Sequence, residues 1–228
     1  MAVRAPAADP ATVRPTDRAA DRATDTGSPT AARLRASARA MLDERGRDGL
    51  TLRAIARRAG VSHGAPLRHF PSLASLLAAV AAEGFEDLIA AVDAQTAVLP
   101  ADAPARARLA AAGRGYVMFA IANPGVFTVM FRPERVDGTD PAYVAASLAS
   151  FGQLAEIVAA TQREGFHPEV DVTRLASVLW TTMHGLADLW VRGGGLPGAD
   201  ASFGLDEFIA LSQSIVLDVG DDAEPGTT

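Results

Sequence analysis

The segment from Thr51 to Phe70, TLRAIARRAGVSHGAPLRHF, constrains the fold of this chain more than any other. Thr51 is a favourable N-cap, and the apolar residues after it recur at helical spacing, which predicts a short amphipathic helix. Gly60 can adopt the left-handed conformation that ends a helix sharply, and Val61 can then pack inward across the turn. Ser62 is placed to cap a second helix. The pattern predicts two short helices joined by a tight turn.

The small residues Ala56, Ala59 and Gly60 let these two helices approach closely, so the side chains of the second helix project outward. A second helix held in this way can enter the major groove of DNA, which is the arrangement of a helix-turn-helix. The alternative is an ordinary helical hairpin in an all-α domain, because a Gly-Val-Ser turn also occurs by chance. The candidate DNA-binding residues are Arg53, Ser62, His63, Gly64, Ala65, Arg68 and His69.

The surrounding sequence resembles a known family. Between residues 31 and 77 the blocks RLRASARAMLDERG, GLTLRAIARRAGVS, HF and LLAAV occur in that order. They resemble the DNA-binding domain of the TetR (tetracycline-repressor) family of transcriptional regulators. The resemblance implies an all-α fold, in which an N-terminal three-helix domain with the helix-turn-helix precedes a larger helical domain for ligand binding and dimerisation. The chain departs from the family at His63, Leu67 and Leu73, where lysine, tyrosine and lysine commonly contact phosphates.

The charge of the chain is polarised. The net charge is −6, yet residues 30–71 hold nine arginines and three acidic residues, a local charge of +6. Residues 1–29 are neutral, and the remainder carries −12. A basic module on an acidic body is expected of a protein that meets a polyanion at one end. Chance clustering on a solvated helical surface is the alternative interpretation.

Composition and local patterning suggest the domain boundaries. Residues 1–29 lack apolar periodicity and are expected to form a disordered arm, either inert or in contact with DNA through Arg14, Arg18 and Arg22. Residues 30–76 would form the DNA-binding domain, 77–219 the ligand-binding and dimerisation domain, and 220–228 an acidic tail. The chain has no cysteine and no N-terminal apolar run, so we expect a cytoplasmic protein without a membrane segment.

The second half of the chain is expected to be helical and to hold a ligand. The segment GYVMFAIANPGVFTVMF resembles the regulatory domain of a TetR subgroup with a Trp-His-Gly signature, for which Trp180, His184 and Gly185 are the candidates. The aromatic and methionine residues near these positions either line a ligand cavity or only fill the core. The candidate ligand-binding residues are Met118, Phe127, Met130, Phe131, Phe151, Trp180 and His184.

Two late helices carry the expected dimer interface. Asp171 should cap a helix that reaches about Val191 and has two apolar stripes, and the final helix should run from about Ser202 to Val219. One stripe would face the core of its own subunit and the other a partner, so that two helices from each subunit build a four-helix interface. A homodimer also suits a palindromic DNA site.

The sequence does not favour catalysis. The four histidines, His63, His69, His167 and His184, are far apart, and no catalytic or metal-binding motif accompanies them. Neither a metal nor a cofactor is therefore expected. The expected function is a ligand-responsive transcriptional regulator, most simply a repressor that binds a palindromic double-stranded operator as a homodimer and is released by a small, largely apolar effector. The alternative is a helical dimer that binds a small molecule and has lost specific DNA binding.

Overall fold

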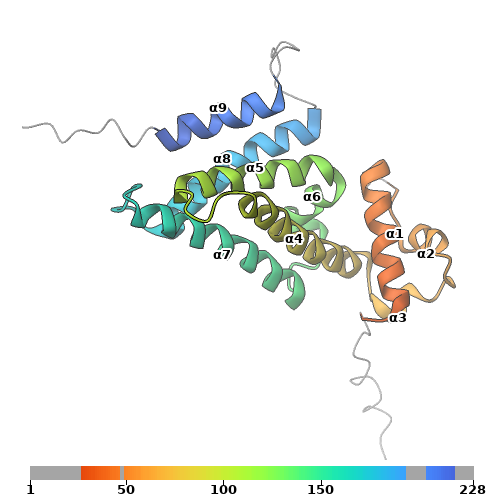
Figure 1. Cartoon of the computed structure of the whole chain (residues 1–228). Helices are drawn as coiled ribbons and strands as arrows, with labels where there is room; N and C mark the ends of the chain where they lie inside the picture. The colour runs from red at the N-terminus through yellow and green to blue at the C-terminus, as the bar shows by residue number, and fades with distance from the viewer. Residues whose placement is uncertain (1–26, 47–48, 194–203, 219–228) are drawn as a thin grey trace, which may run out of the picture.

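The computed structural model describes residues 27–46, 49–193 and 204–218, and within these ranges all regular structure is helical. Most of the expected arm and the whole acidic tail lie outside the described residues. So do residues 202, 203 and 219, which were expected at the two ends of the last helix. The first helices form a small unit, coloured orange in Figure 1, beside a larger helical body. The helices of the small unit are α1 (Pro29–Arg45), α2 (Leu52–Arg58) and α3 (Pro66–His69). The all-α prediction is confirmed.

Local signals in the sequence determine the ends of these helices. Ser28 caps α1 through the N–H of Ala31, and Thr51 caps α2 through the N–H of Ala54, at 3.1 Å. Gly60 has φ +65°, the left-handed value expected for the turn between α2 and α3. The prediction that Ser62 caps the second helix is wrong, because α3 begins at Pro66. Proline is favoured at the first position of a helix, where its missing N–H leaves no hydrogen bond unmade.

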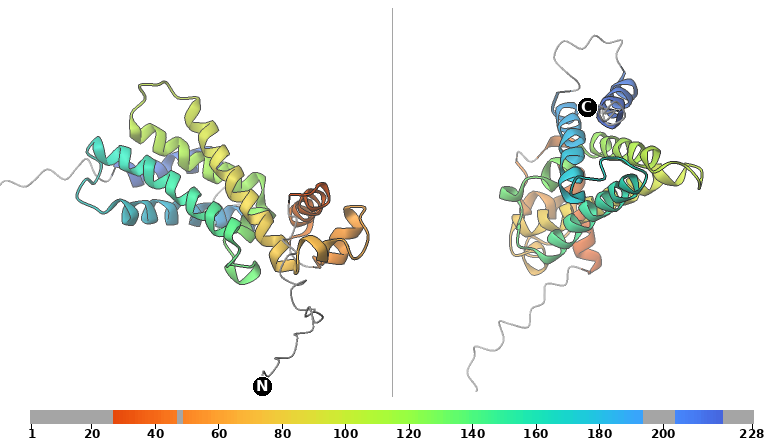
Figure 2. Two further views of the ribbon diagram at one scale, coloured as in Figure 1. Left: turned by 90° about the horizontal axis from the view of Figure 1, so that it is seen from below. Right: turned by 90° about the vertical axis from the view of Figure 1, so that its left-hand side faces the viewer.

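Helix α4 connects the small unit to the body. It begins after the N-cap Ser72 in a capping box and runs from Leu73 to Ala97. It packs against α1 near its start and then against α5 (Ala105–Ala122), α6 (Pro124–Met130) and α7 (Pro141–Arg163). Figure 2 shows α4, in yellow, extending from the small unit into the middle of the body. A single helix therefore belongs to the cores of both parts.

Helices α8 (Val172–Gly193) and α9 (Leu205–Asp218) complete the body. Asp171 caps α8 through the N–H of Arg174, at 3.0 Å, as expected. Both apolar stripes predicted for α8 contribute residues that are buried within the same chain, and a partner contact of this helix stays a prediction. Ala176 and Ala187, from the second stripe, are fully buried within the same chain, because α8 packs against α5 and α7 on both apolar sides.

Candidate functional site

The helix-turn-helix places most of the candidate DNA-binding residues on one exposed segment. Ile55 and Ala56 are buried under α2, and Pro66 and Phe70 are buried at either end of α3. The turn between the helices is closed by the Val61 N–H, which donates to the Ala56 carbonyl at 3.1 Å. This packing turns the following residues to the surface. The exposed candidates are Arg53, Ser62, His63, Gly64 and Arg68.

The remaining two candidates are less accessible. Ala65 is half-buried beside Pro66. His69 is also half-buried, and its Nδ1 lies 3.4 Å from the Ser28 hydroxyl at the start of α1. This hydrogen bond connects α3 to the cap of α1. The structure thus gives His69 a local orienting contact.

The arginines of the small unit divide into two groups. Arg35 is paired with Glu83 of α4, Arg39 with Asp87 of α4, and Arg58 with Glu44 of α1. In contrast, five arginines form no ion pair with any residue that the structure describes, and they remain available to phosphates. These are Arg33, Arg45, Arg53, Arg57 and Arg68. The sequence-level charge of +6 therefore overstates the unpaired positive charge of this unit.

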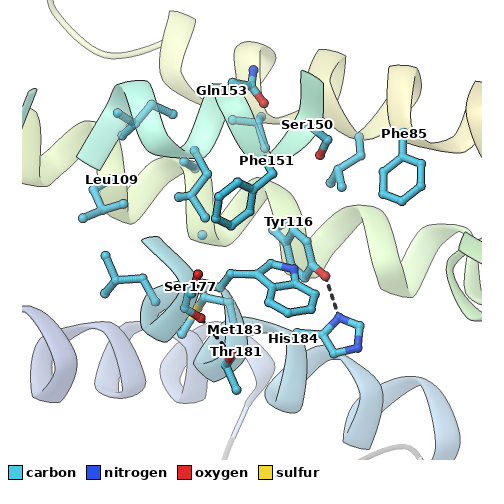
Figure 3. A pocket seen from close by; sticks show the side chains of 18 of the residues that line it. Phe85, Leu109, Tyr116, Ser150, Phe151, Gln153, Ser177, Thr181, Met183 and His184 are labelled. Carbon is cyan, nitrogen blue, oxygen red and sulfur yellow. Dashed lines mark hydrogen bonds between the residues drawn. The ribbon is translucent and has the colours of Figure 1, made fainter. Parts of the chain in front are cut away.

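The body contains a cavity of about 520 Å³ that is lined by residues of α4, α5, α6, α7, α8 and α9 and is partly open (Figure 3). This volume is within the usual range for small-molecule sites, roughly 300–1,000 Å³. Aromatic residues from four helices contribute to its wall. They are Phe85, Tyr116, Tyr143, Phe151 and Trp180, and Phe131 joins them from just beyond α6.

Five of the seven candidate ligand residues line this cavity: Met130, Phe131, Phe151, Trp180 and His184. Phe127 instead lies behind the wall, with its ring centroid 5.1 Å from that of Phe131, and is almost fully buried. Met118 is 38% exposed and lies on another face of α5. It fails to reach the cavity because it is two residues, or about 200° around the helix, from the inward-facing Tyr116.

Tyr116 and His184 form a hydrogen-bonded pair in the cavity wall. The Tyr116 hydroxyl lies 2.7 Å from His184 Nδ1, as the dashed line in Figure 3 marks. The His184 ring also contacts Phe131 and Trp180, with centroids 4.6 and 5.0 Å away. Burial lowers the pKa of His184, although the nearby Asp188 opposes this effect. Burial likewise raises the pKa of Tyr116. Both side chains are therefore neutral near pH 7.

Sequence reasoning did not select Tyr116, Ser150 or Gln153 as ligand residues, yet all three line the cavity. The position of Tyr116 on the apolar face of α5 was a usable signal, because a buried tyrosine hydroxyl needs a hydrogen-bond partner. Ser150 and Gln153 had no such signal, since polar residues on a long helix usually face solvent. Their inward orientation depends on how α7 packs against α4 and α5.

Helix α6 joins the cavity to the small unit. At its start, Gly125 packs against the backbone of α1, and its N–H donates to the Asp43 carboxylate at 3.1 Å. The preceding Asn123 accepts a hydrogen bond from Arg39 at 2.9 Å. At its end, Met130 and the adjoining Phe131 line the cavity. One seven-residue helix therefore contacts both α1 and the cavity.

No group of His, Cys, Asp or Glu residues suited to a metal ion occurs among the described residues. Within the same ranges, α7 is the single helix whose length and hydropathy match those of a membrane span. These criteria are weak for one helix, and α7 also packs against α4, α5 and α8 and lines the cavity.

Two family models match the sequence. The model described as bacterial regulatory proteins, tetR family, matches residues 34–80, and the model described as tetracyclin repressor-like, C-terminal domain, matches residues 109–209. The chain belongs to the TetR family. The prediction of a TetR-type regulator with an N-terminal helix-turn-helix domain is thus confirmed, whereas the Trp-His-Gly subgroup stays a prediction.

Solved structures agree with this assignment. A protein of unknown function from Rhodococcus sp. RHA1 is 35% identical, with 84% of this chain and 95% of that chain covered and a TM-score of 0.72. A tetR-family regulatory protein from Rhodococcus RHA1 is 23% identical, with coverage of 86% and 100% and a TM-score of 0.62. The fatty acid degradation regulator FadR from Bacillus halodurans shares the fold at 14% identity, with coverage of 83% and 95% and a TM-score of 0.66. No curated protein matches the sequence.

Proposed function

We propose that this TetR-family chain is a repressor that binds a palindromic operator as a homodimer and leaves it when a small effector occupies the cavity. The observation that carries the proposal is the joint position of α6, which contacts α1 of the DNA-binding unit at one end and the cavity at the other. A site for DNA and a site for a ligand thereby share one rigid connection. Action on DNA also implies a cytoplasmic protein and a role that requires no catalysis.

Exposed groups of the small unit support DNA binding. Arg53 and Arg68 lie near the helix-turn-helix surface without an ion-pair partner among the described residues, and His63 is exposed between them in sequence. Arginine can bind guanine or phosphate, and histidine can donate to either. Gly64 has no side chain, so the backbone can approach DNA closely at this residue. Each unpaired arginine that binds a phosphate should increase the salt dependence of binding.

Exposed apolar side chains support a dimer built by α8 and α9. Val178 and Leu189 of α8 are 61% and 48% exposed, and Leu211 and Ile215 of α9 are 48% and 58% exposed. Apolar residues in such numbers on two neighbouring helices favour burial against a second copy. A dimer would place two recognition helices about 34–36 Å apart for successive major grooves.

The effector can act only if it binds one arrangement of the DNA-binding units better than the other. Met130 and Phe131 provide the contact through which a bound molecule could displace α6. The close packing of Gly125 on α1 would pass that displacement to the DNA-binding unit. The ion pairs of Arg35 and Arg39 with α4 are a second connection between α1 and the body, so α1 would also respond to a movement of α4.

One observation favours the second candidate, a small-molecule-binding dimer without specific DNA binding. Three arginines of the small unit are occupied by Glu83, Asp87 and Glu44, which leaves less free charge than the sequence indicated. The two candidates differ in whether sequence-specific binding exists at all.

Fluorescence anisotropy with DNA from upstream of the protein's own gene, compared with scrambled DNA over a salt series, distinguishes them. We expect tight binding of two chains per site to the upstream DNA and a loss of about 1–3 kcal/mol in Arg68→Ala. The control Arg163→Ala removes an exposed arginine from the far end of α7 and should bind normally. Equal, weak binding to both DNAs would support the second candidate.

A further inference from the structure

The wall of the cavity carries no formal charge. None of the residues that line it is an Asp, Glu or Arg, and His184 is held neutral by its apolar surroundings. Charged groups lie behind the wall: Asp93 accepts from Gln153 at 2.7 Å, and a smaller pocket on another side of His184 contains Arg132, Asp188 and Arg192. Arg192 is already bonded to Asp188, at 2.7 Å. A charged ligand in the large cavity would lose its hydration without gaining an ionic partner, which is strongly unfavourable.

Most polar groups of the wall are already satisfied by their own helices. The hydroxyls of Ser147, Ser177 and Thr181 donate to backbone carbonyls three or four residues earlier. Gln153 donates to Ile89 and Asp93, and Gln213 donates to Ala110. These groups have little donor capacity left for a ligand.

Two polar points remain. One is the Tyr116–His184 pair, in which one proton lies between the Tyr116 oxygen and His184 Nδ1, and the other is Ser150. The Ser150 hydroxyl has no hydrogen-bond partner among the residues that the structure describes. In Figure 3 Ser150, Tyr116 and His184 lie toward one side of the cavity, with Leu109 at the opposite side. The polar groups that remain available to a ligand therefore lie toward one side of the cavity, whereas Gln213, near Leu109, is already bonded to the Ala110 carbonyl.

We propose that the effector is an uncharged molecule whose hydroxyl or carbonyl oxygen bonds to the Tyr116–His184 pair and whose apolar body fills the rest of the cavity. This inference rests on the proposed function, because it specifies the effector of that regulator. A hydroxyl or carbonyl fits because Ser150 can donate to an oxygen lone pair, and so can Tyr116 when His184 Nδ1–H donates to the Tyr116 oxygen. In the other tautomer Tyr116 donates to His184, and its oxygen can accept from a ligand hydroxyl. The aromatic wall suits a hydrocarbon or ring system as the rest of the molecule. Free carboxylates and amines are excluded by the missing counter-charge.

A displacement assay tests this charge preference with matched probes. The full-length protein is loaded with N-phenyl-1-naphthylamine, a neutral probe that fluoresces in apolar sites, and titrated at pH 7.5 with 1-decanol, 2-decanone, decanoate or decylammonium. The four competitors share a ten-carbon chain and differ in the head group. We expect the alcohol and the ketone to displace the probe at concentrations at least tenfold lower than either ion.

Two variants locate the polar contact. Tyr116→Phe retains the ring and removes the hydroxyl. It should weaken the binding of 1-decanol by about tenfold and leave displacement of the probe by decane unchanged. Ser177→Ala also removes a hydroxyl from the wall, but that hydroxyl is bonded to the Thr173 carbonyl, so no change is expected. Circular dichroism and thermal unfolding confirm that each variant is folded. If Tyr116→Phe binds 1-decanol as tightly as the unmodified protein, the assigned contact is wrong.

The possible failures are distinguishable. If decanoate or decylammonium competes as well as 1-decanol, the inference is overturned, while the cavity remains a ligand site and the proposed function stands. If the protein binds neither the fluorescent probe nor any competitor, the inference is overturned together with the effector part of the proposed function. Operator binding is measured separately and is independent of both outcomes.

Discussion

At the scale of single residues, Gly125 allows a close approach between the DNA-binding unit and the body. A Cβ atom at this position would lie 2.3 Å from the Leu42 carbonyl carbon and oxygen, and 2.7 Å from the Asp43 nitrogen. All three are backbone atoms of α1, so no side chain can rotate away. The absence of a side chain at Gly125 is what allows α6 to lie directly on α1.

Gly125→Ala should therefore force α6 and α1 apart and lower the free energy of unfolding by about 1–3 kcal/mol. Urea denaturation at one fixed protein concentration measures the change. Gly152→Ala is the matched control, because a Cβ on Gly152 in α7 meets nothing within 4 Å. That helical substitution should stabilise the protein by about 0.5–1 kcal/mol. Equal stability of Gly125→Ala and the unmodified protein would contradict this packing.

His184 should make stability depend on pH. Burial lowers the pKa of His184 in the folded state below its unfolded value of about 6.5, so the folded chain binds fewer protons there. The contribution of neutral His184 to the free energy of unfolding is complete above about pH 6.5. It is lost as the pH falls from there through the pKa of the folded state. Urea denaturation between pH 8 and pH 5 should show a steeper loss for the unmodified protein than for His184→Gln. Parallel pH profiles of stability for the two proteins would refute the lowered pKa of His184.

At the scale of elements, two ion pairs hold α1 against α4. Arg35 and Arg39 lie one turn apart on α1, and their partners Glu83 and Asp87 lie one turn apart on α4. The two helices therefore share a ladder of opposite charges along one line of contact. Because the second pair is partly exposed, its stabilising effect is expected to be small and to be screened by salt.

Reversal of the Arg39–Asp87 pair tests this ladder. Arg39→Glu should lower the free energy of unfolding, because a new carboxylate would lie beside Asp87. The exchange Arg39→Glu with Asp87→Arg should recover part of the loss, with a coupling energy of about 0.2–1 kcal/mol that decreases in high salt. Recovery should be incomplete, since Arg39 also donates to Asn123. Strict additivity of the two substitutions in urea denaturation would argue against the pair.

At the scale of the whole molecule, the exposed apolar residues of α8 and α9 form the proposed dimer interface. Val178 and Ile215 are 61% and 58% exposed, on helices that lie at the surface of the body in Figure 1. A further apolar side chain, Leu148 on α7, is 66% exposed. The dimer interface could therefore lie on α8 and α9 or on α7. The proposed dimer uses α8 and α9.

Ile215→Asp should convert the dimer to a monomer, because dimerisation would bury an unpaired carboxylate. Sedimentation equilibrium measures the mass, and the same variant should lose high-affinity operator binding. Val98→Asp is the control: Val98 is 79% exposed just beyond α4, and the protein should stay dimeric. A dimer that survives Ile215→Asp but dissociates in Leu148→Asp would move the interface to α7.

Much of the helical architecture could be predicted because its signals are local. Thr51 and Ser72 cap helices through their own hydroxyls, and Gly60 adopts positive φ where a helix must end. Asn123-Pro124 separates α5 from α6 as expected. Such signals depend on hydrogen bonds within a few residues, so they can be recognised without knowledge of the rest of the chain. The exception, Ser62, shows that proline at the first helical position outweighed a favourable capping residue.

The candidate ligand residues were less predictable, because a cavity is a property of several helices at once. Periodicity identifies an apolar face, but it does not say whether that face meets another helix or empty space. Met118 and Phe127 therefore satisfied the same pattern as Phe131 and Trp180, although only the latter two reach the cavity. Tyr116 and Ser150 were not selected for the converse reason, since their role depends on what lies opposite them.

The sequence by itself determined the class of fold and the helix-turn-helix, because capping, turn and periodicity signals are contained in short stretches of chain. The TetR family followed from the resemblance of the sequence blocks between residues 31 and 77. Only the tertiary structure decided which arginines remain unpaired, which side of α8 stays exposed, and that the Tyr116–His184 pair lies in the wall of an uncharged cavity. These properties join residues 48 to 68 positions apart in the sequence. Contacts of that range arise from the packing of whole helices, which no local pattern encodes.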